Sequence, residues 1–86
     1  MGEWTDPLQP IKPSDEMSVL IFLRNHNYIQ GIDAISKDKL TRALGWEPLK
    51  LRLVLEHFYD SGWIGLKLKD EVFITPLGIK ILMRLN

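Results

Sequence analysis

The chain has 86 residues, which is enough for one small domain with a modest core. Hydrophobic residues make up 45% and charged residues 26%, a balance typical of globular rather than disordered proteins. The absence of cysteine excludes disulfides and thiolate metal sites. The longest apolar run, residues 19–23, is far too short to cross a membrane. We therefore expect a cytoplasmic (intracellular) domain that has no membrane partner.

Charge is balanced over the whole chain but not along it. Eleven basic residues offset eleven acidic ones, yet residues 37–86 alone hold nine basic and six acidic side chains, a net charge of +3. Proteins that bind nucleic acid place cations against the phosphates. The second part of the chain is therefore where we expect any such contact.

Residues 1–13 hold three of the five prolines and show no periodic pattern, which predicts an extended N-terminal tail. The apolar residues Trp4, Leu8 and Ile11 indicate that this tail docks on the domain or on a second copy. The folded domain is expected over residues 14–86. Ser14 is a suitable N-cap for a first helix, and residues 32–35 fit a short strand.

Two further helices are predicted from their caps. Ser36 is a suitable N-cap for a helix over residues 37–44, which Gly45 ends because glycine readily adopts a left-handed backbone. Pro48 suits the first turn of a third helix that reaches about Ser61. Steps of 100° per residue around this helix give a buried stripe of Leu51, Val54, Leu55 and Phe58.

The remaining sequence predicts a β-hairpin and a last helix. Residues 63–68 and 72–75 carry strand-forming side chains on either side of a turn at residues 69–71. Alternation along the first strand assigns Ile64, Leu66 and Leu68 to a packing face, and Lys67 and Lys69 to its reverse. Pro76 then opens a helix that runs to the end of the chain.

Four short signals together carry a family resemblance. In chain order they are Ala43-Leu44-Gly45-Trp46, then Leu51 with Leu55 in the following helix, then Ser61-Gly62-Trp63-Ile64, and last Ile74-Thr75-Pro76-Leu77-Gly78. In this order, over residues 15–86, the chain resembles winged helix-turn-helix transcriptional regulators of the MarR, ArsR and PadR kind. The resemblance implies a mainly α fold with a small β-hairpin, in the α+β class, with a three-helix core, a wing and a C-terminal helix.

In that family the third helix enters the major groove, while the start of the second helix and the wing touch phosphates. The resemblance therefore implies a transcriptional regulator that binds double-stranded DNA. The residues expected to contact nucleic acid are Lys37, Lys39, Lys50, Arg52, Lys67 and Lys69. Solvated helix faces and protection of a strand edge would also account for the lysines.

An alternative function follows from the outward side of the third helix. Leu49 and Leu53 lie one turn apart there, where related regulators usually carry polar residues. Such a ridge favours contact with a protein partner or a second copy, with Trp4, Leu8 and Ile11 as a clasp.

Nothing in the sequence indicates an enzyme. His26 and His57 belong to different helices, and no second histidine lies at metal-ligand spacing. A glycine-rich phosphate loop, a nucleophile elbow and a zinc pattern are all missing from the sequence. We therefore expect a non-catalytic protein that uses no cofactor, metal or small-molecule substrate.

Overall fold

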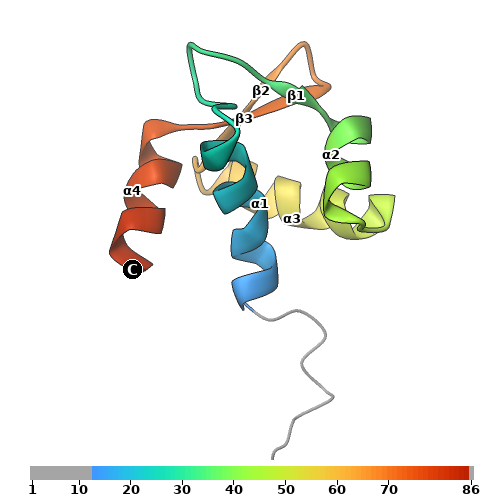
Figure 1. The fold of residues 1–86 in the computed structure, drawn as a ribbon, viewed down its shortest axis with the longest axis horizontal. Coiled ribbons are helices and arrows are strands. Elements are labelled where there is room, and N and C mark those ends of the chain that lie inside the picture. The colour runs from blue at the N-terminus through green and yellow to red at the C-terminus, as the bar shows by residue number, and fades with distance from the viewer. Residues whose placement is uncertain (1–12, 86) are drawn as a thin grey trace, which may run out of the picture.

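The computed structural model describes residues 13–85, which form a small α+β domain. The predicted tail, with Trp4, Leu8 and Ile11, lies outside the described residues. Figure 1 shows α1 near the centre, with α2 and α4 on opposite sides of it and the strands crossing one end. In chain order the elements are α1 (Pro13–Asn25), β1 (Ile35–Ser36), α2 (Lys37–Leu44), α3 (Pro48–Asp60), β2 (Ile64–Lys67), β3 (Glu71–Ile74) and α4 (Pro76–Leu85).

The caps of α2 act as the sequence predicts. The Ser36 hydroxyl accepts a hydrogen bond of 3.2 Å from the Lys39 N–H, which satisfies one free donor of the first turn. Gly45 ends the helix at a φ of 69°, and its N–H bonds back to the carbonyls of Thr41 and Arg42. The predicted bounds of α2 are therefore confirmed.

The strands form an antiparallel three-stranded sheet in the order β1-β3-β2. The predicted hairpin is present, with Ile64 opposite Ile74 and Lys67 opposite Glu71. β1 joins the other edge of β3, where Ser36 pairs with Glu71. The prediction of a strand at residues 32–35 was wrong in position, because the chain turns at Ile32, which is 68% exposed, and pairing starts only at Ile35.

The core lies between the helices and one face of the sheet. Leu51, Val54, Leu55 and Phe58 are all buried, as the spacing in α3 predicts. They pack with buried residues of every other element, namely Val19, Leu20, Leu23, Ile35, Leu40, Ile64, Val72, Ile74 and Leu82. Burial of this continuous apolar cluster is the main stabilising contribution to the domain.

The assignment of Leu68 to the packing face was wrong. The side chain is 82% exposed, and β2 ends one residue before it. Leu68 and Lys69 have φ values of 56° and 67°, so the turn begins earlier than predicted. Residues 68–70 connect the paired Lys67 and Glu71, and the Asp70 N–H donates to the Lys67 carbonyl at 3.3 Å, so the chain leaves the strand at Lys67.

Candidate nucleic-acid interface

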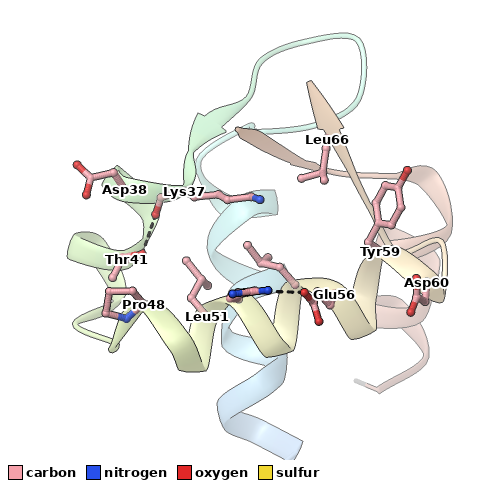
Figure 2. Close-up of a pocket in the computed structure, with 11 residues that line it drawn as sticks. Lys37, Asp38, Thr41, Pro48, Leu51, Glu56, Tyr59, Asp60 and Leu66 are labelled. Atoms are coloured by element: carbon pink, nitrogen blue, oxygen red, sulfur yellow. Dashed lines mark hydrogen bonds and ion pairs between the residues drawn. The ribbon is translucent and has the colours of Figure 1, made fainter. Parts of the chain in front are cut away.

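α2, α3 and β2 enclose a groove of about 540 Å³. Figure 2 shows Leu51 rising from α3 and Leu66 facing it from β2, with Tyr59 at one end and Asp38 at the other. The floor is apolar because Leu51 and Leu55 are core residues. Charged side chains surround it, contributed by Lys37, Asp38, Arg52, Glu56 and Asp60.

Two of the six predicted nucleic-acid contacts meet in this groove. Lys37 extends over it from the start of α2, and Arg52 lines it from α3. Lys39 is exposed on α2 but does not line the groove. Lys67 and Lys69 are exposed at the end of the hairpin.

The hairpin turn is attached to the start of α2. The Lys37 N–H donates a hydrogen bond of 2.9 Å to the Asp70 carbonyl, directly after the Ser36–Glu71 strand pair. These backbone contacts hold the turn against the first residue of α2. Lys37, Lys67 and Lys69 therefore belong to segments that lie side by side, although 30 residues separate Lys37 from Lys67.

The two cations predicted on α3 lie on opposite flanks of the helix. The Arg52 guanidinium is 3.3 Å from Glu56 in an exposed ion pair beside the groove. The Lys50 ammonium instead lies over the Trp46 ring, 4.3 Å from its centre, in a cation–π contact. Since residues two apart on a helix are 200° apart, Lys50 and Arg52 do not form one cationic surface.

The outward face of α3 is apolar and acidic. Leu49 and Leu53 are 62% and 53% exposed, and the carboxylates of Glu56 and Asp60 lie further along the helix. Glu56 is paired with Arg52, but Asp60 forms no ion pair within residues 13–85. A phosphate backbone would repel that carboxylate, whereas the leucines carry no charge at all.

The spatial distribution of charge differs from the linear one. Residues 37–71, which build α2, α3 and the hairpin, hold seven basic and six acidic side chains, a net charge of only +1. The other two cations of the predicted basic half are Lys80 and Arg84, exposed on α4. Because α4 lies across α1 from α2, these two charges do not add to the groove surface (Figure 1).

Tyr59 and Thr41 are groove residues that the sequence reasoning missed. Tyr59 follows Arg52 by seven residues, two helical turns, so the same 100° spacing would have assigned both to one side of α3. The Thr41 hydroxyl donates to the Lys37 carbonyl at 2.7 Å, and no sequence pattern marks it as a groove residue.

Neither a metal site nor a membrane-spanning helix is found in the described part of the chain. Between residues 13 and 85, no three His, Cys, Asp or Glu side chains gather where they could hold a metal ion. Over the same residues, no helix combines the length and apolar character needed to cross a bilayer. Comparison with family models, with curated proteins and with solved structures found no match to this chain.

Proposed function

We propose that this chain is a winged helix-turn-helix protein that binds double-stranded DNA and regulates transcription. The observation that carries the proposal is the arrangement of three helices and a hairpin in which the hairpin turn bonds to the start of α2. That arrangement agrees with the wing and second helix of the family that the sequence resembles. Its helix α3 lies beside them, where it would enter the major groove.

The contacts in this proposal are mainly electrostatic. Lys37, Lys39, Lys67 and Lys69 come from the two neighbouring segments, and none of them forms an ion pair within residues 13–85. Each can neutralise a phosphate and release a counterion. Arg52 can join them, because opening an exposed pair such as Arg52–Glu56 costs only about 0.3–0.5 kcal/mol.

Salt-dependent binding tests the proposal. Four phosphate contacts predict a slope of log K against log salt of about −3 to −4, so affinity for duplex should fall roughly 100-fold between 50 and 200 mM salt. Fluorescence anisotropy with a random-sequence duplex measures both quantities. Replacing Lys37, Lys39, Lys67 and Lys69 together by glutamine should remove most of the slope.

The matched control changes Lys80 and Arg84 to glutamine, since these cations lie on α4, away from the groove. Its slope should equal that of the unmodified chain. Failure of the unmodified chain to bind duplex at about 50 mM salt would refute the proposal.

A second candidate function is favoured by one observation, the exposure of Leu49 and Leu53 on the outward face of α3. Two leucines one turn apart form an apolar ridge that suits contact with a protein partner or a second copy of the chain. The net charge of only +1 over residues 37–71 also suits a protein partner, because it gives little general attraction to DNA.

Analytical ultracentrifugation tests the homodimer form of this candidate. Leu53→Asp should shift the sedimentation coefficient to that of a monomer, because it places a carboxylate in an apolar contact. Circular dichroism should be unchanged, since Leu53 is 53% exposed. Met83→Asp on α4 is the control and should leave sedimentation unaltered. Equal sedimentation of all three proteins would rule out a dimer built on this ridge.

A further inference from the structure

β2 is an edge strand beside the groove, because β3 lies between it and β1. The N–H and C=O of Ile74 bond to the segment 28–30, on the side of β3 away from β2. These directions alternate along a strand, so Glu71 and Phe73 bond to β2 instead. Leu66 lies between their two partners in β2 and therefore turns its own N–H and C=O away from β3.

The backbone of Leu66 is both unpaired and accessible. Neither its N–H nor its C=O forms a hydrogen bond with another residue in the range 13–85. Ile64 has the same orientation but is only 2% exposed, whereas Leu66 is half-buried and faces Leu51 across the groove (Figure 2). An extended peptide can supply the missing bonds of such an edge and place alternate side chains in an adjacent pocket.

Two unpaired charges of opposite sign line the groove at its two ends. Lys37 is the first residue of α2 and Asp60 is the last residue of α3, so each charge opposes the dipole of its own helix. Neither side chain forms an ion pair within the described residues. Both positions are unfavourable to the fold, and they are complementary to a ligand that is anionic near Lys37 and cationic near Asp60.

We propose that the groove binds an extended peptide that pairs antiparallel with β2 through Leu66. Antiparallel pairing continues the pattern of the existing sheet and is slightly more stable per residue. β2 runs from the Asp60 end of the groove toward the hairpin turn, which bonds to Lys37. The peptide therefore begins with acidic residues and ends with basic ones. Its apolar residues occupy every second position, because a side chain opposite Leu66 shares the face that lines the groove.

The peptide acetyl-Glu-Glu-Val-Thr-Val-Lys-Lys-amide tests the backbone pairing. Fluorescence anisotropy with the full chain measures its affinity, and hydrogen exchange at the Leu66 N–H should slow when it binds. N-methylation of both valines removes N–H groups that face β2, so affinity should fall about ten-fold. N-methylation of the threonine and the first lysine is the matched control. Those N–H groups point away from β2, so the affinity should be unchanged.

An exchange of charges tests the orientation. Asp60→Lys should weaken binding of this peptide about five-fold and strengthen binding of Glu-Glu-Val-Thr-Val-Glu-Glu by a similar factor. A loss of structure could not produce the second effect. Circular dichroism should be unchanged, since lysine suits the C-terminal end of a helix. The control is Asp33→Lys, because Asp33 is exposed but does not line the groove, and both affinities should equal those of the unmodified chain.

Three results would overturn the inference. The first is that the unmodified chain fails to bind the peptide at about 1 mM. The second is equal affinity for the two methylated peptides, which would mean that the ligand does not pair with β2. The third is an Asp60→Lys variant that binds both peptides like the unmodified chain. DNA binding is a separate matter: a chain that binds the peptide but no duplex keeps this site and refutes the proposed function, and the reverse result refutes only the peptide site.

Discussion

At the scale of single residues, Gly78 is held at a crowded junction. Thr75 connects the start of α4 to the end of α3: its hydroxyl donates to the Gly62 carbonyl at 2.6 Å and accepts from the Gly78 N–H at 3.1 Å. These bonds bring Gly78 so close to Trp63 that a Cβ on the glycine would lie 2.2 Å from the Trp63 carbonyl oxygen. The Thr-Pro-Leu-Gly segment of the sequence thus has a packing reason for its glycine.

Gly78→Ala should lower the free energy of unfolding by about 2–3 kcal/mol. Helix propensity alone predicts the opposite, a gain of about 1 kcal/mol. The steric effect wins because the crowding atoms include backbone, which cannot move without disturbing β2. Urea denaturation followed by circular dichroism measures the difference.

Gly45→Ala provides the comparison for that experiment. Gly45 has a φ of 69°, but a Cβ there would have no atom within 4 Å. Only backbone strain remains, which costs about 1–2 kcal/mol. A Gly78→Ala variant as stable as the unmodified chain would show that the junction is looser than described.

At the scale of elements, the start of α2 depends on Ser36, which is both the last residue of β1 and the helix cap. Ser36→Ala should cost about 1 kcal/mol, because the Lys39 N–H loses its acceptor. Ser61→Ala is the matched control, since the Ser61 hydroxyl only donates to a carbonyl, that of His57, at the end of α3. Chemical denaturation of the two variants should rank Ser36→Ala as the less stable; the reverse order would argue against the cap.

The helices could be predicted from the sequence, whereas the tip of the hairpin could not. Ser36 and Gly45 are residue types that cap helices, so they predict both ends of α2, and the spacing of apolar residues in α3 predicts which of its sides is buried. The turn at Leu68-Lys69 lacks the glycine or asparagine that normally marks a turn. The alternation of apolar side chains therefore predicts a strand that continues through Leu68, one residue beyond its observed end.

At the scale of the whole molecule, position in the sequence proved a poor guide to where charge lies. The net charge of +3 over residues 37–86 suggested one basic surface, yet α4 carries Lys80 and Arg84 away from the groove. Only Lys37 and Arg52 of the predicted contacts line that groove. Lys37 lies near Lys67 because β1 pairs with β3, and this pairing joins residues far apart in the sequence, so local sequence patterns do not predict it.

The bond between the Asp70 carbonyl and the Lys37 N–H has a mechanical consequence. Together with the Ser36–Glu71 strand pair, it fixes the position of the hairpin relative to α2 through the backbone rather than through flexible side chains. Under the proposed function, the two segments therefore meet a duplex as one rigid surface. A duplex whose shape does not match this surface would have to deform to fit the protein.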